Sequence, residues 1–249
     1  MGASTGTASK QPVLEDDGSD LAAVGQSAAC PEPLVVALTG GPAAGKSSAL
    51  TSLRARFSNV DIQVITVPET ATHFFTNSDG MQVLGADVVD EVRMQRIFFE
   101  YQLAQEDAFL ELARLQSTKP ALLVLDRCAL DSRVFLGDEK WLQMLTLPGK
   151  RKFSEPVLLR RYDVLIHLHT CAGHAEYSWG IDSSNPTRHH SADDAKALDE
   201  RTGWVIHDHT WRRVAPYMTS LEEHMEAVYR LVHDALRELR DLKVAARVL

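Results

Sequence analysis

This sequence of 249 residues predicts a three-layer α/β/α fold built around a parallel β-sheet. The first observation is that short, continuously apolar runs alternate with segments of helical periodicity. Such runs are typical of strands buried on both faces, as in parallel sheets whose crossovers are helices. The second observation is a glycine-rich loop between the first apolar run and the first helical segment. The third is that acidic residues follow directly after two of the apolar runs.

The glycine-rich loop at residues 40–47 reads Gly-Gly-Pro-Ala-Ala-Gly-Lys-Ser and fits the phosphate-binding pattern G-x-x-x-x-G-K-[ST] at every fixed position. An apolar run at 34–38 precedes it, and a helical segment at 48–54 follows it. Strand, loop and helix in this order form the context that the motif requires. The pattern therefore predicts a P-loop NTPase fold that binds ATP or GTP together with Mg²⁺.

The P-loop pattern assigns a role to each of its residue types. Gly40 and Gly45 let the backbone approach phosphate oxygens, where a side chain would collide. Lys46 would neutralise the β- and γ-phosphates, and the Ser47 hydroxyl would coordinate Mg²⁺. The residues expected to bind the nucleotide are Gly40, Gly41, Pro42, Ala43, Ala44, Gly45, Lys46, Ser47 and Ser48. The sequence shows no N-K-x-D segment for reading guanine, so it leaves ATP and GTP open.

Four more strands are expected, at 62–67, 121–125, 164–168 and 214–218. Helices between them imply right-handed crossovers and a sheet covered on both faces. The longest internal helix is expected at about 88–115. The last helix should begin after a capping box formed by Ser220 and Glu223, and its apolar positions recur at helical spacing.

Two acidic residues follow predicted strands, at the sheet edge where ligands bind in parallel sheets. Asp126 ends the third strand and would hold Mg²⁺, directly or through water. Glu69 follows the second strand and would accept a proton from a hydroxyl acceptor. Arg127 would bind a phosphate, and Asp131, one helical turn further on, would orient Arg127. The alternatives are a helix-dipole acid at Glu69 and a capping residue at Asp126.

The residue after Asp126 separates two classes of P-loop protein. Hexameric ATPase motors usually have glutamate there, which activates water, whereas this chain has Arg127. A hydrolysing motor is therefore disfavoured, and so is an ordinary small GTPase. Transfer of a phosphoryl group to a small acceptor is the better interpretation.

The long helix at 88–115 places Gln95, Gln102 and Glu106 on one face together with core residues. Buried polar groups need partners. Either these groups bond within the protein, or Gln95 and Gln102 line the acceptor pocket. A polar stretch from Thr170 to about His190 is long enough for a lid that closes over phosphates, with Arg188 as its arginine. The alternative is a disordered surface loop.

Composition narrows the partners and the setting. The chain is 45% hydrophobic and 24% charged, as in globular proteins, and its net charge of −8 argues against nucleic acid as a partner. Cysteines at 30, 128 and 171 form no C-x-x-C, which favours reduced thiols in the cytoplasm. The sequence has no apolar run long enough for a transmembrane helix.

Two further features of the sequence bear on domain organisation and on metal binding. Residues 1–31 are rich in Ala, Ser, Gly and Thr and lack periodicity, so we expect a disordered tail before a single domain at 32–249. Histidines pair two apart at His167 and His169 and again at His207 and His209. Because no third ligand lies at metal-like spacing, a zinc site is not expected.

A series of motifs in order resembles the NadR-like AAA domain family, which unites the nicotinamide riboside kinase domain of NadR with the TRPL translocation defect protein. The resemblance covers nearly all of the chain from about residue 34 to the last helix. The motifs are residues 38–47, Val67-Pro68-Glu69-Thr70-Ala71, Tyr101-Gln102-Leu103 with Glu106, Asp126-Arg127-Cys128-Ala129-Leu130-Asp131, Asn185-Pro186-Thr187-Arg188, Ala195, Leu198-Asp199 and Trp204.

The resemblance implies a fold like that of nucleoside and nucleotide kinases, with ATP or GTP and Mg²⁺ bound. Two functions follow from it. The first is a kinase that phosphorylates a small, nucleoside-like acceptor, with Lys46, Arg127 and Arg188 stabilising the transferred group. The second is a nucleotide-dependent regulator of membrane trafficking that binds phospholipid or a protein partner. A slow NTPase is a third possibility.

Overall fold

The computed structural model describes residues 32–57, 62–77, 90–116, 119–148, 153–172 and 191–248, with side chains described as far as Leu239. The expected tail at 1–31 and most of the expected lid, including Arg188, lie outside the described residues. The boundary of the domain at residue 32 therefore stays a prediction.

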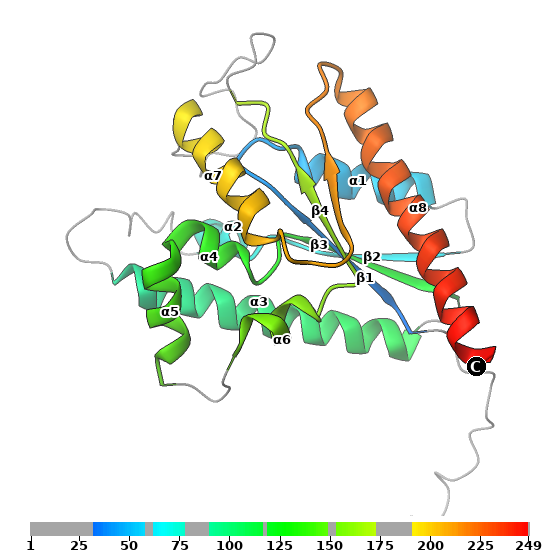
Figure 1. The fold of residues 1–249 in the computed structure, drawn as a ribbon, viewed down its shortest axis with the longest axis horizontal. Coiled ribbons are helices and arrows are strands. Elements are labelled where there is room, and N and C mark those ends of the chain that lie inside the picture. Colours follow the sequence, from blue (N-terminus) through cyan, green and yellow to red (C-terminus); the bar gives the residue numbers. More distant parts are fainter. Residues whose placement is uncertain are drawn as a thin grey trace, which may run out of the picture.

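In the described part of the chain, five parallel strands form the central sheet (Figure 1). They are β1 (Leu34–Thr39), β2 (Gln63–Val67), β3 (Ala121–Asp126), β4 (Val164–Leu168) and β5 (Arg212–Ala215), in the spatial order β2-β3-β1-β4-β5. The predicted α/β fold with a parallel sheet is confirmed. β1 and β3 are buried over their whole length, which explains their continuous apolar sequences.

The fifth strand lies upstream of its predicted position at 214–218. It covers Arg212–Ala215 and ends before Pro216. Proline has no backbone N–H to donate to a neighbouring strand, so a ladder that runs through Pro216 to Met218 is disfavoured. The prediction followed the apolar residues and overlooked this constraint.

Helices cover both faces of the sheet because side chains alternate along each strand. Val36 and Leu38 of β1 belong to the core beneath α1 (Lys46–Phe57) and α8 (Leu221–Val248). Val35 and Ala37 belong to the opposite core. The helices that contribute to this second core are α3 (Glu91–Gln116), α4 (Asp131–Leu136), α5 (Asp138–Thr146), α6 (Glu155–Leu159) and α7 (Ala192–Val205). Figure 1 shows the two layers, with α1 and α8 on one side.

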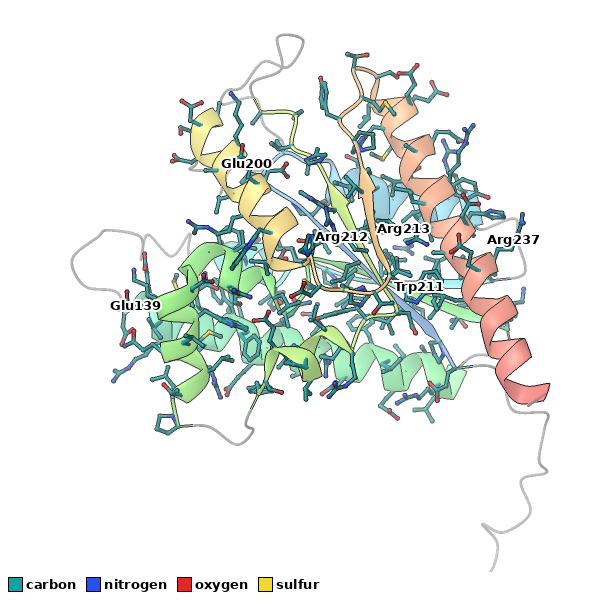
Figure 2. All side chains as sticks on the ribbon, in the orientation of Figure 1. Glu139, Glu200, Trp211, Arg212, Arg213 and Arg237 are labelled. Atoms are coloured by element: carbon teal, nitrogen blue, oxygen red, sulfur yellow. The ribbon has the colours of Figure 1, made fainter. Side chains whose placement is uncertain are left out.

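Helix boundaries agree with the sequence patterns where those patterns were strong. α3 occupies the predicted long helix, and α8 begins after Ser220, whose Oγ accepts from the Glu223 amide at 3.4 Å. Charged residues lie on the outer faces of helices, as Glu139 on α5, Glu200 on α7 and Arg237 on α8 show (Figure 2). No helix in the described part of the chain has the combined length and apolar character needed to span a bilayer.

The register of the sheet gathers the functional loops at one edge. Leu38 at the end of β1 lies opposite Asp126 at the end of β3, and Thr39 lies opposite His167 of β4. The short helix α2 (Thr70–Asn77) begins three residues after Val67, the last residue of β2, on the same edge. The carboxyl ends of four neighbouring strands therefore surround the glycine-rich loop.

Candidate functional site

The loop after β1 has the backbone that a phosphate cradle requires. Gly40 has φ +143° and Gly45 has φ +78°, and Ala43 also lies in the left-handed region at φ +60°. A Cβ atom at Gly40 would lie 2.1 Å from the carbonyl oxygen of Leu168, so only glycine fits at that position. α1 begins immediately after the loop at Lys46, which points the free amides of its first turn toward the cradle.

Lys46 folds back onto the loop that carries it. Its Nζ donates to the carbonyl oxygens of Gly40 at 3.1 Å and Gly41 at 2.9 Å. Burial, together with the nearby positive charge of Arg127, lowers the pKa of Lys46 to about 8. A phosphate beside Nζ would restore the charged form, because an opposite charge favours the ammonium.

Ser47 and Asp126 meet across the loop. The Ser47 hydroxyl donates to Asp126 Oδ2 at 2.9 Å, whereas Oδ1 of Asp126 is buried and has no hydrogen-bond partner among the described residues. Burial raises the pKa of Asp126, so the carboxylate needs a cation to stay ionised. A hydroxyl and a carboxylate oxygen are ligands that Mg²⁺ prefers, and the unpartnered oxygen fits the ion or one of its waters.

Glu69 directly precedes the first residue of α2 and forms an ion pair with Arg127 through Oε1. Its second oxygen accepts from the Thr72 hydroxyl at 2.5 Å. Burial alone would raise the pKa of Glu69, but Arg127 and Lys46 outweigh it and hold that pKa at about 2. Glu69 is therefore a carboxylate at all physiological pH values and a weak base.

Arg127 connects the P-loop to the acidic residues. Its φ of +77° is unusual for a residue with a Cβ atom, and such strain persists where surrounding contacts fix the backbone. The guanidinium donates to Asp131 Oδ2 at 3.0 Å and to the Gly40 carbonyl oxygen at 3.4 Å. Burial opposes its charge, but Glu69 and Asp131 more than offset that effect and raise its pKa.

Asp131 lines the cavity and contacts Arg127 there. It is buried, and its Oδ1 accepts from the Thr39 hydroxyl at 2.6 Å. The sequence analysis gave Asp131 the task of orienting Arg127, and the geometry places it in contact with that side chain. A second support is the Phe135 ring, whose centre lies 5.2 Å from the guanidinium carbon.

One continuous cavity of about 460 Å³ runs from the P-loop to α3. Residues 42–48 of the predicted nucleotide-binding set line it, whereas Gly40 and Gly41 do not. Beyond Glu69 and Arg127 the cavity is lined by side chains of α2 and α3, including Phe75, Met94, Gln95, Phe98 and Gln102. An apolar wall with a few polar groups is typical of small-molecule pockets.

The two candidate glutamines differ in how they face this cavity. Gln95 lines it and is half-buried. Gln102 also lines it, but its Oε1 accepts from the Thr70 hydroxyl at 2.6 Å and its Nε2 donates to Glu106 at 3.1 Å. Gln102 therefore forms hydrogen bonds within the protein, which is one of the two alternatives that the sequence left open. Those bonds hold its side chain beside the cavity.

Glu106 extends this network toward the loop that carries Arg127. It accepts from the Tyr162 hydroxyl at 2.9 Å and from Arg161 at 2.8 Å. The Tyr162 hydroxyl in turn accepts from the backbone N–H of Ala129 at 2.7 Å. Burial raises the pKa of Glu106, and Arg161 opposes that shift only in part. The network fixes α3 relative to the 127–130 turn.

The structure thus brings Lys46, Ser47, Glu69, Asp126 and Arg127 together around one cavity. Arg188 lies outside the described residues. The sequence did not predict the aromatic side chains Phe75 and Phe98 at the cavity, nor the role of Tyr162. Their positions depend on how elements far apart in the chain pack together. Asp199 of α7 was named only as part of the family resemblance, without a role, and its Oδ1 accepts from the Gly41 amide at 2.9 Å. No local sequence pattern links Asp199 to the P-loop.

Comparison with known proteins agrees with this geometry. A family described as "AAA domain" matches residues 35–224, which include the P-loop, Glu69, Asp126 and Arg127. The thymidylate kinase of Ehrlichia chaffeensis has a similar structure, with a TM-score of 0.50 and 13% sequence identity over 83% of this chain and 100% of that chain. At that identity the likeness shows the fold, and the fold is kinase-like as predicted. A search of curated protein sequences found no significant match.

Proposed function

The chain belongs to this AAA domain family, and we propose that it is a kinase that transfers the γ-phosphoryl group of ATP or GTP to a hydroxyl of a nucleoside-like small molecule. The observation that supports the proposal most directly is the cavity that continues past the phosphate cradle. Water needs no such pocket, whereas an organic acceptor does. The kinase-like P-loop fold supports nucleotide binding. The residues that line the cavity beyond the P-loop would contact the acceptor.

In this proposal the charges around the cradle act on the transferred group. Lys46 and Arg127 would stabilise the charge that develops on the phosphoryl oxygens, and Arg188 would add to it from the segment outside the described residues. Ser47 and Asp126 would hold Mg²⁺. When bound, that ion would neutralise charge on the β- and γ-phosphates.

Glu69 would accept a hydrogen bond from the acceptor hydroxyl and orient it toward the phosphate. Its pKa of about 2 makes it a poor proton acceptor early in the reaction. Phosphoryl transfer passes through a loose transition state, in which positioning matters more than early deprotonation. The proposed role is thus orientation of the hydroxyl and of Arg127, with the proton passing to Glu69 late in the transfer.

The acceptor end suits a planar, partly apolar group. Phe75 and Phe98 line the cavity with ring centres 5.7 Å apart and nearly perpendicular planes. A ring entering there could stack on one face and meet the edge of the other. Gln95 would then supply hydrogen bonds to a base or an amide.

A regulatory function in membrane trafficking is the second candidate. One observation favours it. Both oxygens of Glu69 already have partners, Arg127 and Thr72, so the carboxylate proposed to hold the acceptor hydroxyl is not free for it. On this hypothesis bound nucleotide would change association with acidic phospholipid or a protein partner. Vesicle flotation with no nucleotide, a diphosphate and a non-hydrolysable triphosphate tests it, and no lipid binding in any state counts against it.

Mass spectrometry of reaction products tests the kinase proposal. The full chain would be incubated with Mg²⁺ and ATP or GTP and a panel of nucleosides, with Lys46→Ala as the blank. A new monophosphate that is absent from the blank is the expected result and names the acceptor. Nucleotide binding by thermal shift without any product across the panel would contradict the proposal.

A further inference from the structure

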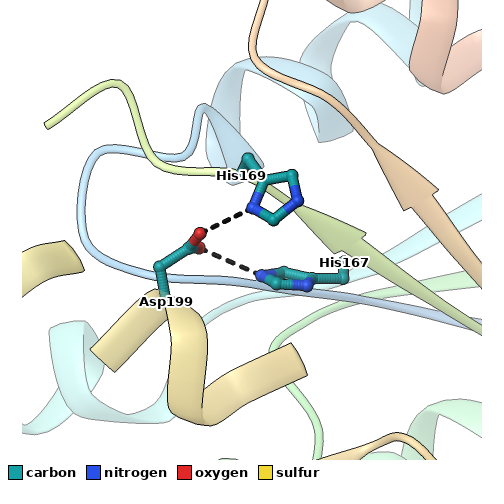
Figure 3. A group of neighbouring side chains, drawn as sticks. All are labelled: His167, His169 and Asp199. Carbon is teal, nitrogen blue, oxygen red and sulfur yellow. Dashed lines mark hydrogen bonds and ion pairs between the residues drawn. The ribbon is translucent and has the colours of Figure 1, made fainter. Parts of the chain in front are cut away.

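A second group of potential ligands lies behind the P-loop, away from the cavity. His167 of β4 and His169 just after it converge with Asp199 of α7 (Figure 3). One ligand atom from each side chain lies within 4.8 Å of the others. The side chains of His167 and Asp199 are 2% and 7% exposed, whereas that of His169 is 44% exposed. The group is therefore anchored in the protein and open to solvent on one side.

Both imidazoles already contact the carboxylate. His167 Nε2 lies 3.0 Å from Asp199 Oδ1, and His169 Nδ1 lies 2.7 Å from Oδ2 of the same carboxylate. Metal–ligand bonds of about 2.0–2.2 Å to nitrogen and oxygen place neighbouring ligand atoms roughly 3 Å apart. The three side chains need only a small expansion to accept an ion between them.

We propose that His167, His169 and Asp199 bind a divalent transition-metal ion of the Zn²⁺ class, in a site separate from the Mg²⁺ site at Asp126. Two imidazoles and a carboxylate form a ligand set that suits zinc rather than magnesium, which prefers oxygen alone. The half-exposed edge at His169 leaves room for a water molecule as a further ligand.

The surroundings of Asp199 supply the support that ligating carboxylates usually have. Its Oδ1 accepts from the Gly41 amide at 2.9 Å, a second contact that fixes the carboxylate.

The other histidine pair provides an internal contrast. His209 uses Nε2 on the Tyr162 carbonyl oxygen at 2.9 Å, and its Nδ1 accepts from the Trp211 amide at 3.2 Å. Its partner His207 contacts the neighbouring Asp208 at 3.3 Å on the surface. Both pairs have the same spacing of two residues, but among the described residues only the first pair converges with a buried carboxylate. Asp199 lies 30 residues after His169, which is why spacing alone did not predict the site.

A metal ion here would brace α7 against β4 and the P-loop. A Cβ atom at Gly41 would lie 2.8 Å from the Ala195 carbonyl oxygen and 2.9 Å from the Cβ atom of Asp199, so the helix and the loop are in close contact. An ion that links Asp199 to the end of β4 would hold this contact in place. The expected role is structural, and it does not depend on the proposed kinase activity.

Metal binding to the untagged full chain tests the proposal. Protein stripped with a chelator would be titrated with Zn²⁺ in excess Mg²⁺, against a chromogenic competitor. One equivalent of tightly bound Zn²⁺ and a higher thermal transition are expected, because a ligand that binds only the native state stabilises it. No stoichiometric Zn²⁺ binding would overturn the proposal.

Variants assign the ion to these side chains. His169→Ala should still fold, because that side chain is half-exposed, and should weaken Zn²⁺ binding by at least about 100-fold, since even outer-shell losses cost about 10–100-fold. His207→Ala is the matched control from the second pair and should bind as the wild type does. Asp199→Asn is the second variant, read by the same competition. Zn²⁺ binding unchanged in His169→Ala would overturn the assignment.

Discussion

The two ends of the cavity differ in how their polar groups are paired. At the P-loop end, Asp126 keeps a buried oxygen without a partner among the described residues, and burial lowers the pKa of Lys46 to about 8. At the acceptor end, Gln102 and Glu69 bond to other side chains of the protein. The difference indicates that charged groups would contribute most to nucleotide binding, whereas shape complementarity and aromatic contacts would contribute most to acceptor binding.

Arg127 contacts both ends, the Gly40 carbonyl oxygen of the P-loop and the Glu69 carboxylate, so its loss should have the largest effect. Arg127→Met removes the charge proposed to stabilise the transferred group, and residues in that role are worth about 10³–10⁵ in turnover. We expect turnover to fall by at least ~10³, with the thermal transition also lowered because Glu69 and Asp131 lose their partner.

Steady-state kinetics with the acceptor found by mass spectrometry measures this effect. Arg230→Met is a control, because Arg230 pairs with Glu226 on the surface of α8. That variant should match the wild type. Wild-type turnover in folded Arg127→Met would remove Arg127 from the proposed chemistry.

Glu69→Gln sharpens the distinction between the two ends. It removes the carboxylate that would accept the proton of the hydroxyl, while Lys46 and Ser47 of the phosphate cradle are unchanged, so we expect a loss of about 10²–10⁴ in turnover. The nucleotide affinity, measured by calorimetry, should stay close to that of the wild type. Equal losses of turnover and of nucleotide affinity would show that Glu69 serves the nucleotide end instead.

The pH dependence of nucleotide affinity isolates Lys46. Phosphates favour its charged form, so the pKa in the complex lies above the value of about 8 in the free protein. Binding therefore takes up a proton above pH 8, and the affinity should fall by up to about tenfold per pH unit there. Below pH 8 Lys46 is already charged and contributes no such slope.

Titrations of nucleotide at several pH values above and below 8 test this linkage. Lys46→Met should bind more weakly overall and lose the slope, because the titrating group is gone. A slope of the same size in Lys46→Met would assign it to another group.

Tyr162→Phe should give the smallest of the four effects, and it should act on the acceptor end. The change removes one hydroxyl that bonds to Glu106 and to the Ala129 amide, both buried, at a cost of about 1–3 kcal/mol in the free energy of unfolding. We expect the acceptor KM to change more than the nucleotide affinity. Tyr229→Phe, on the opposite core, is the matched control for denaturant unfolding.

The same contrast between the two ends explains what could be predicted from the sequence. The nucleotide end is formed by contiguous residues and by acids at strand ends, so the P-loop, Asp126 and Glu69 could be located from local patterns. The acceptor end and the metal group depend on which helix faces meet. Phe75, Phe98 and Asp199 come from α2, α3 and α7, and no short-range pattern fixes how those helices pack.

The fate of the γ-phosphoryl group is the most direct test of phosphoryl transfer. With saturating acceptor, the amount of phosphorylated acceptor would be measured against the amount of nucleoside diphosphate released. The proposed kinase predicts a ratio close to one, with little free phosphate. Diphosphate and free phosphate formed in equal amounts, without phosphorylated acceptor, would show transfer to water and contradict the kinase function.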